Sequence, residues 1–214
     1  MQISILCSDE DHPINSYLQR WIVKWNKTHE ISLVRKKKDL SGGDILFLIS
    51  CAEFITSEDR SLFRNNLVIH ASDLPKGRGW SPVVWQLLEG ESEITVTLLE
   101  ADEKVDSGDI WKKIRCLIPK DALWDEINNH LFQAEIDLMD YGVEFCNEVN
   151  PVKQSSDVKP TYYPRRLPKD SEIDPEESIV SQFDRIRVSD PNRYPAFFEL
   201  HGTRYKLVLE KIHE

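Results

Sequence analysis

The chain has 214 residues and a formal net charge of −10 at pH 7. This length suffices for one ordinary domain with a full hydrophobic core, or for one domain with a small appendage. The negative charge disfavours nucleic-acid partners, because backbone binding depends on clustered Lys and Arg side chains. We expect the one basic run, Arg35 to Lys38, to be a solvated loop.

Membrane and metal-binding signals are missing from the sequence. No stretch approaches the roughly 20 consecutive apolar residues that a membrane span requires, and the first residues lack the basic start and apolar run of a signal peptide. We therefore expect a cytoplasmic protein without a membrane partner. The four cysteines are widely spaced and form no C-x-x-C pair, so we expect free thiols and no zinc or redox site.

Apolar strands alternate with amphipathic helices in the first part of the chain. Strands are predicted at residues 2–6, 31–34, 44–49, 67–69 and 93–100. Helices are predicted after a cap at Asp11–His12 with Pro13 inside it, from Ser81 to Gly90, and from Asp121 to Tyr141. This alternation predicts an α/β fold with an open, mostly parallel sheet and helices on both faces.

A polar stretch at residues 150–159 has the composition of a linker. We therefore predict one domain over residues 1–149 and a small C-terminal α+β subdomain over residues 150–214. In the latter, Asp174-Pro175-Glu176-Glu177 resembles a capping box that opens a helix through about Arg187. Strands at 196–200 and 205–209 would follow as a hairpin, and the exposed surface of this subdomain would suit a homodimer interface.

The most informative segment is the loop that follows the strand ending at His70. It reads His70-Ala-Ser72-Asp-Leu-Pro-Lys76-Gly-Arg78-Gly-Trp80-Ser-Pro82. In open α/β sheets, ligands bind beyond the carboxyl ends of the strands, and an imidazole can carry a proton near neutral pH. A lone histidine at a strand end is more often structural, so the surrounding motif decides between the two readings.

This loop resembles the His-x-Ser-x-Leu-Pro signature of the folate-dependent formyltransferase family. A second signature of that family, an Asp-x-Gly turn feeding a helix, is matched 36 residues after His70 by Asp106-Ser-Gly108. The resemblance extends to Tyr162–Pro168, the Ile173–Asp174 helix start, and Arg187 ahead of Tyr194–Phe198, and is strongest to bacterial sugar N-formyltransferases of the pseudaminic-acid type. It implies a formyltransferase with a Rossmann-like catalytic domain, acting in glycan biosynthesis.

The resemblance implies direct transfer of a formyl group from N10-formyltetrahydrofolate to the amine of a nucleotide-linked amino sugar. The neutral amine attacks the formyl carbon, and the tetrahedral oxyanion then collapses without a covalent enzyme intermediate. His70 would handle a proton or hydrogen-bond the oxyanion, and Asp106 would orient His70 or accept the proton of the amine. Without the context of His70, Asp106 would read equally well as a turn residue.

Binding residues follow from the same resemblance. The folate would lie against Phe54, Ile55, Leu99, Asp102 and Asp106, chiefly through main-chain donors and acceptors. The phosphorylated acceptor would meet Lys76, Arg78 and Trp80 on the loop after His70, together with Arg165 and Arg187.

One departure from the family pattern concerns the oxyanion. The family has Asn two residues before the histidine, and this chain has Val68. On a regular strand Asn66 would lie about 13 Å from His70. We expect Ser72 or a backbone N–H to supply the donor; a bulge that brings an Asn within reach, or slow or lost chemistry, are the alternatives.

Other functions remain open at this point. The transformylase of purine synthesis acts on glycinamide ribonucleotide and has a similar length, but the Arg-Gly-Trp-Ser-Pro continuation favours the sugar enzymes. A tRNA-modifying formyltransferase is disfavoured, since such enzymes carry a larger basic C-terminal domain. A non-catalytic protein that binds folate or sugar is a further alternative. Its best support is Val68, which stands where the family has Asn.

Overall fold

The computed structural model describes residues 1–212. The strands of the main sheet are β1 (Gln2–Leu6), β2 (Glu30–Val34), β3 (Gly43–Leu48), β4 (Phe63–His70), β6 (Glu93–Glu100) and β7 (Ile110–Leu117). The α-helices are α1 (Asn15–Trp25), α2 (Ser57–Ser61), α3 (Pro82–Leu88), α4 (Trp124–Glu144) and α5 (Ile179–Arg187). Two short two-stranded sheets are formed by β5 (Arg78–Gly79) with β8 (Tyr162–Tyr163) and by β9 (Ala196–Leu200) with β10 (Thr203–Leu207).

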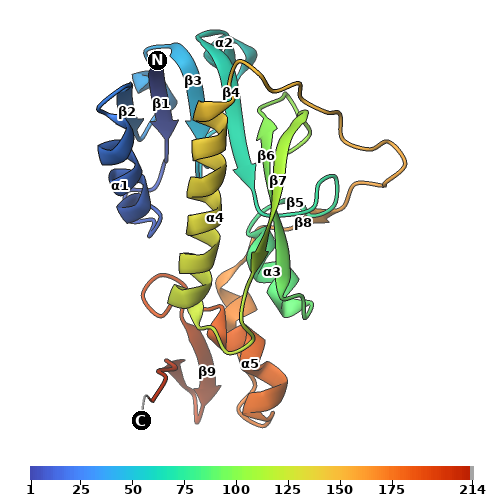
Figure 1. Ribbon diagram of the computed structural model, residues 1–214. Coiled ribbons are helices and arrows are strands. Elements are labelled where there is room, and N and C mark those ends of the chain that lie inside the picture. Colours follow the sequence, from blue (N-terminus) through green and yellow to red (C-terminus); the bar gives the residue numbers. More distant parts are fainter. Residues whose placement is uncertain (213–214) are drawn as a thin grey trace.

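The main sheet has six strands in the order β2-β1-β3-β4-β6-β7 (Figure 1). The first four strands run parallel to one another, whereas β6 pairs antiparallel with both β4 and β7. The sheet is thus mostly parallel, which confirms the predicted α/β fold class. The carboxyl end of β4 places His70 opposite Thr97 of β6.

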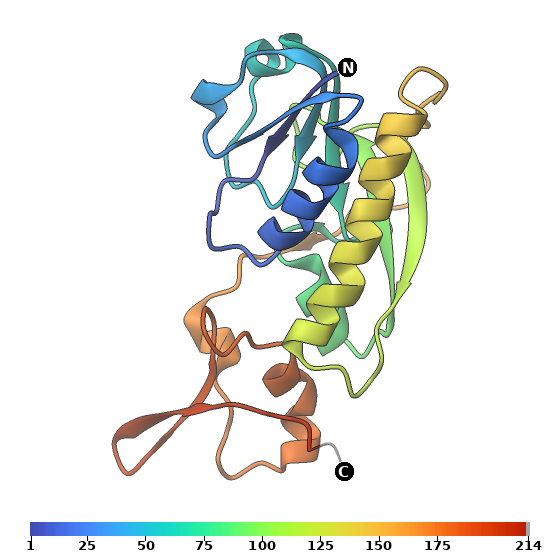
Figure 2. The same cartoon turned by 60° about the vertical axis from the view of Figure 1, so that its left-hand side comes forward.

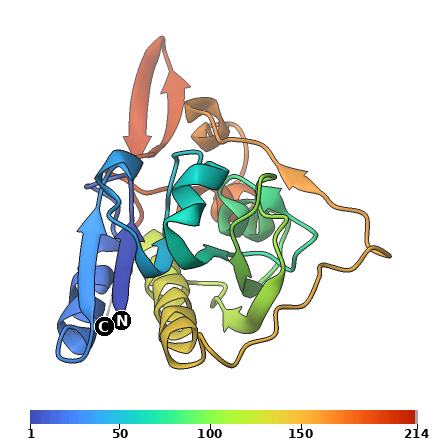
Figure 3. The ribbon, with the colours of Figure 1, turned by 90° about the horizontal axis from the view of Figure 1, so that it is seen from above.

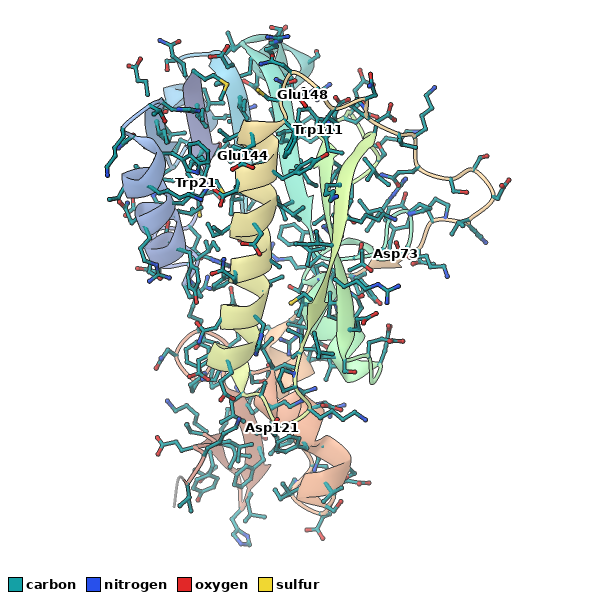
Figure 4. The ribbon with its side chains drawn as sticks, in the orientation of Figure 1. Trp21, Asp73, Trp111, Asp121, Glu144 and Glu148 are labelled. Atoms are coloured by element: carbon teal, nitrogen blue, oxygen red, sulfur yellow. The ribbon has the colours of Figure 1, made fainter. Side chains whose placement is uncertain are left out.

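The two faces of the sheet are covered differently. Side chains alternate along β3, so that Phe47 packs in the large core under α1 and α4, while Leu46 and Leu48 face a smaller cluster on the opposite side. Figure 2 shows α1 and α4 side by side on one face. Two indole N–H groups, of Trp21 and Trp25 on α1, donate to Asp140 of α4 and fix this pair. Trp21 is labelled in Figure 4.

Three helices begin later than predicted. Helix α4 starts at Trp124 instead of Asp121, and α1 and α5 start later because side chains make different caps. The Asn15 amide donates to the carbonyls of Asp9, Glu10 and His12, which keeps Asp11 to Ile14 in turns, so that α1 starts at Asn15. Asp174 to Glu177 likewise form a turn rather than the first turn of a helix. Ser178 caps α5 by accepting from the backbone N–H of Ser181.

The segment after Gly108 was predicted as a helix, and this is wrong. The Asp106–Asp109 turn feeds β7, an eight-residue strand that alternates only weakly between buried and exposed positions. The β6–β7 register also shifts between Leu98 and Leu99. A bulge of this kind blurs the period-two pattern by which a half-buried strand is recognised.

The C-terminal part builds a small core of its own around Ile173, Ile186 and Ala196. The hairpin was predicted correctly, with β10 beginning at Thr203 instead of Tyr205, since His201 and Gly202 form a two-residue turn with positive φ. Polar contacts to the first part include Lys211 with Asp121 and Glu126. The domain boundary at residue 150 stays a prediction.

The segment predicted as a linker is anchored through Val152 and Gln154, while most of its other residues are exposed. It leaves α4, swings outward, and returns beside the loop that follows His70 (Figure 3). Val152 exchanges two backbone hydrogen bonds with Ile110, and β8 pairs in parallel with β5. We call residues 150–163 the strap.

Within residues 1–212, no helix combines the length and the apolar character needed to cross a bilayer. All four cysteines are free thiols, and Cys7 and Cys116 are buried. Burial raises the pKa of the Cys116 thiol to about 11, with a further contribution from nearby Glu135.

Glu135 of α4 is a buried carboxyl group, and burial raises its pKa to about 8. Above pH 4.5 the unfolded chain loses this proton while the folded protein keeps it until about pH 8. The free energy of unfolding therefore falls through this window, by about 1.4 kcal/mol per pH unit. Glu135→Gln should abolish this slope and be the more stable protein above pH 8, as measured by urea denaturation between pH 5 and 9.

Glu144→Gln on the exposed end of the same helix is the matched control (Figure 4). Its unfolding curve should follow the wild type at every pH. Parallel pH dependences of the wild type and Glu135→Gln would contradict a neutral Glu135 in the folded state.

Candidate active site

His70 is the last residue of β4, and its imidazole is buried, with 8% of the side chain exposed. Nε2 lies 2.8 Å from the carbonyl oxygen of Gly77, and Nδ1 lies 3.5 Å from Oδ2 of Asp106. The strand thus delivers the imidazole to a place where both ring nitrogens face an acceptor. The loop after His70 and the β6–β7 turn supply these two acceptors.

Asp106 sits in the β6–β7 turn with a positive φ of 54°. Its carboxylate is 7% exposed, and Oδ2 accepts the backbone N–H of Gly79 at 2.8 Å. Gly108 follows in the same turn, where a Cβ would lie 1.9 Å from the carbonyl oxygen of Glu100. Only glycine fits there, which explains the Asp-x-Gly spacing.

The contacts of His70 assign a hydrogen-bonding role to each ring nitrogen. A carbonyl oxygen can only accept, so Nε2 is the donor when it bonds to Gly77. Nδ1 faces the carboxylate of Asp106. The pair is therefore suited to hold a proton next to a reacting group, which is the requirement for general acid–base catalysis.

Ser72, expected as a possible donor, is nearly fully buried at 2% exposure. Its hydroxyl donates to the carbonyl of Lys76, and its own carbonyl accepts from Thr97. Ser72 therefore shapes the loop between His70 and Gly79, and its proton is already used in this conformation.

Neither asparagine near His70 replaces the missing amide at Val68. The register of β4 with β3 and β6 is regular from Asn65 to His70, so there is no bulge to bring an Asn closer. The Asn66 amide donates to the carbonyl of Arg60. Val68 packs with Ile55 and Ala101 in the cluster on the sheet face opposite α1 and α4. The alternative of a bulged strand is therefore wrong.

The residues expected to bind the folate fall in two loops that approach each other. Ile55 after β3 and Ala101 after β6 belong to the same apolar cluster, which also contains Val68. Phe54 is 60% exposed, and Asp102 is exposed in the β6–β7 turn beside Asp106. Leu99 is fully buried inside the sheet, between Val68 and Ile110, and exposes no atoms to a ligand.

The five residues expected to bind the acceptor have different positions. Lys76 is exposed, and so is Trp80, with the Arg165 guanidinium 5.1 Å above the centre of its ring. Arg78 is buried and bonds to Gln154 and Tyr162. Arg187 is 3% exposed.

Arg187 has a structural role that its sequence context did not reveal. Its guanidinium donates to Asp184 on α5 and to the carbonyls of Pro119 and Ala122 before α4. The structure therefore does not bring Arg187 together with His70, in contrast to the expectation.

Gln154 on the strap is a site residue that the sequence analysis missed. Its amide nitrogen donates to the carbonyls of Asp106 and Gly108 at 2.8 and 3.0 Å. The polar composition around it indicated only a linker, and no spacing rule connects it to a turn 48 positions earlier.

A cavity of about 260 Å³ lies elsewhere, between the start of α4 and Lys211. Its lining includes Asp121 and His130 but neither His70 nor Asp106.

Comparison with known proteins gives the family. Methionyl-tRNA formyltransferase from Protochlamydia amoebophila is 28% identical over 147 residues, which are 67% of this chain and 46% of that protein. The chain thus spans about half the length of the curated relative it matches.

Three solved structures share the fold. A methionyl-tRNA formyltransferase from Clostridium thermocellum has a TM-score of 0.83 at 22% identity, covering 100% of this chain and 94% of that one. HypX from Aquifex aeolicus in complex with tetrahydrofolic acid has a TM-score of 0.77 at 20% identity, covering 98% and 37%. A sugar N-formyltransferase from a Shewanella species has a TM-score of 0.71 at 15% identity, covering 100% and 99%.

A family model described as formyl transferase matches residues 10–140, more than half of the chain. This match includes β4 with His70 and the turn with Asp106. At the level of the family, it confirms the expected enzyme class and co-substrate. The chain belongs to the formyl transferase family, whose members take the formyl group from a formyl-tetrahydrofolate.

Proposed function

We propose that this protein transfers the formyl group of N10-formyltetrahydrofolate to the amine of a nucleotide-linked amino sugar. The buried pair of His70 and Asp106, on loops of a formyl transferase fold, is the observation that carries the proposal. The acceptor would belong to bacterial glycan biosynthesis, with the pseudaminic-acid type as its narrowest form, and the reaction would be cytoplasmic.

The residues present fit the co-substrate. A pterin is a flat ring with hydrogen-bond donors and acceptors along one edge, and the loops after β3 and β6 offer main-chain groups of both kinds. Phe54 adds an exposed aromatic surface, and Asp102 an exposed carboxylate. When bound there, the co-substrate supplies an activated formyl carbon next to Asp106.

Asp106 is the group that receives the proton of the attacking amine. Oδ2 is held by the Gly79 N–H and faces His70. Within residues 1–212, no donor bonds to Oδ1, which leaves this oxygen for the amine. The adjacent imidazole orients the carboxylate through Nδ1, and its Nε2–H donates to the oxygen that becomes negative as the amine adds.

For Nε2 to reach that oxygen, its bond to the Gly77 carbonyl must be exchanged for one to the substrate. The Gly77 carbonyl therefore turns away from His70 during the cycle. Lys113 ties Asp73 and the carbonyl of Leu74 to β7, and Arg78 is bonded to Gln154, so the movement is limited to the peptide group of Gly77.

The proposed acceptor site lies beside this loop. Trp80 is 46% exposed under Arg165, and Tyr162 is 63% exposed nearby on β8. Flat aromatic surfaces suit a nucleobase or sugar ring, and the cations of Lys76 and Arg165 suit a diphosphate. These exposed side chains support a small phosphorylated acceptor.

Methionyl-tRNA is the second candidate acceptor, because the curated relative is a methionyl-tRNA formyltransferase. A net charge of −10 opposes it, since tRNA binding gains its affinity largely from phosphate contacts with Lys and Arg. Two further alternatives are formylation of glycinamide ribonucleotide and a non-catalytic binding role. One experiment distinguishes all four.

The experiment offers the purified protein N10-formyltetrahydrofolate with several amines and identifies the formylated product by mass spectrometry. The panel comprises 4-amino nucleotide sugars, glycinamide ribonucleotide and methionyl-tRNA. Formylation of a nucleotide sugar, with a kcat/KM at least about tenfold above the other amines, supports the proposal. Preference for methionyl-tRNA or glycinamide ribonucleotide, or folate binding without any product, sinks it.

Val68→Asn provides a test of the missing oxyanion donor. An amide at this position lies on the same strand face as His70, and one such donor contributes about 10²- to 10³-fold to kcat in other acyl transfers. We expect kcat to rise by at least about tenfold, and the free energy of unfolding to fall by about 1 to 3 kcal/mol, because an amide enters an apolar cluster.

Val68→Ala is the control for this prediction, since it removes the packing of Val68 without adding a donor. Its kcat should stay at or below the wild-type value. Equal kcat values for the Asn and Ala variants would mean that another group already serves the oxyanion.

A further inference from the structure

The strap crosses the outer side of the β6–β7 turn, and one of its side chains bonds directly to that turn. Gln154 uses both hydrogens of its amide, one on the carbonyl of Asp106 and one on the carbonyl of Gly108. Gln154 thus bridges two carbonyls of the turn. The same turn carries the Asp106 carboxylate, which we propose acts on the amine.

The oxygen of the Gln154 amide links the turn to the His70 loop, and we call the resulting set of hydrogen bonds the circuit. Oε1 accepts from Nη2 of Arg78 at 2.7 Å, and the next residue, Gly79, donates its backbone N–H to the Asp106 carboxylate at 2.8 Å. Asp106 is therefore held at its carbonyl and at its carboxylate by two neighbouring residues of the His70 loop, one of them acting through Gln154.

This circuit stabilises an unfavourable backbone conformation in the turn. Asp106 has a left-handed backbone, which costs about 1 to 2 kcal/mol for a residue other than glycine. Such a conformation persists only where the surroundings enforce it. Donors on the two carbonyls that flank Ser107 enforce it directly.

The positions of the partners are themselves well fixed. Arg78 is 8% exposed and also bonds to the Tyr162 hydroxyl, while its backbone N–H donates to the carbonyl of Thr161. Val152 is anchored on Ile110 by two backbone hydrogen bonds, two residues before Gln154. Gln154 is therefore held between the Val152 anchor and the Arg78 side chain.

We propose that Gln154 is a positioning residue that holds the Asp106 carboxylate at the reacting atoms, so that the strap forms part of the catalytic centre. The inference rests on the proposed function. It predicts that Gln154 affects kcat, because it acts through the geometry of Asp106, and not the KM of either substrate.

Gln154→Met, which keeps the length of the side chain and removes the amide, is expected to lower kcat by about 10- to 100-fold and to change both KM values less than about twofold. Lys153→Met, at the exposed neighbouring position on the strap, is the matched control and should behave as the wild type. In an Asp106→Asn background, Gln154→Met should cost much less than in the wild type.

Several results would overturn the inference. These are wild-type kcat in Gln154→Met, a rise of KM alone, and an equal loss of kcat in both backgrounds. Gln154→Glu provides a second variant that keeps the Arg78 partner and loses the two donors, and its kcat should also fall; wild-type kcat in this variant would likewise oppose the inference.

A readout independent of turnover separates this inference from the proposed function. The imidazole ¹⁵N chemical shifts of His70 should change in Gln154→Met and stay constant in Lys153→Met, because displacement of Asp106 alters the partner of Nδ1. Inactive wild-type protein would remove the proposed function and leave this measurement in place. Unchanged shifts in Gln154→Met would remove the positioning role.

Discussion

Replacement of His70 by Ala is expected to lower kcat by about 10²- to 10⁴-fold, with Asp106→Asn falling in the same range. His70→Ala removes the only imidazole beside Asp106 among residues 1–212, and Asp106→Asn removes the group that we propose takes the proton of the amine. Both are measured as the rate of tetrahydrofolate release with the preferred amine at saturation.

Glu103→Gln, an exposed change in the same turn, is the matched control and should keep the wild-type kcat. Circular dichroism and the melting temperature show whether the variants fold. A folded His70→Ala protein with a kcat within about threefold of the wild type would exclude His70 from the chemistry.

Gly108→Ala should be the most damaging single-methyl substitution in this turn. A Cβ would lie 1.9 Å from the carbonyl oxygen of Glu100, and both groups belong to the main chain, so the turn itself must shift. We expect the free energy of unfolding to fall by about 3 kcal/mol or more, and turnover to be lost because Asp106 moves with the turn. Urea denaturation and the tetrahydrofolate-release assay measure the two effects.

Gly90→Ala is the control for the cost of losing a glycine. Gly90 has a φ of 90° and no atom within 4 Å of an added Cβ, so only backbone strain of about 1 to 2 kcal/mol is expected, with full activity. If Gly108→Ala were no worse than Gly90→Ala, the close approach to Glu100 would not constrain the turn.

The sheet was predictable wherever burial followed a clear period. Strands β1 and β6 were predicted with their observed bounds, because nearly all of their residues after the first are buried or half-buried. Strand β7 escaped prediction, since its polar and apolar residues alternate irregularly beside a shifted register. The starts of α1 and α5 are set by local hydrogen bonds of Asn15 and Ser178, which hydrophobic periodicity does not reveal.

The proximity of His70 and Asp106 was predictable from two short motifs, whereas the residues that support this pair were not. His70 and Asp106 stand at positions that a local signature marks, and the fold brings them to 3.5 Å. Gln154 and Arg187 make their contacts across 48 and 65 or more positions, so neither role leaves a local pattern. Arg187 was expected to bind the substrate, but it is buried and connects α5 to the segment before α4.

Transfer of a labelled formyl group tests the central claim most directly. The protein is incubated with N10-formyltetrahydrofolate labelled in its formyl carbon and the preferred nucleotide-linked amino sugar, and label and tetrahydrofolate are quantified together. We predict one labelled N-formyl product for each tetrahydrofolate released, and neither in Asp106→Asn beyond a residual rate. Label recovered as free formate, or tetrahydrofolate released without labelled product, would contradict direct transfer to the amine.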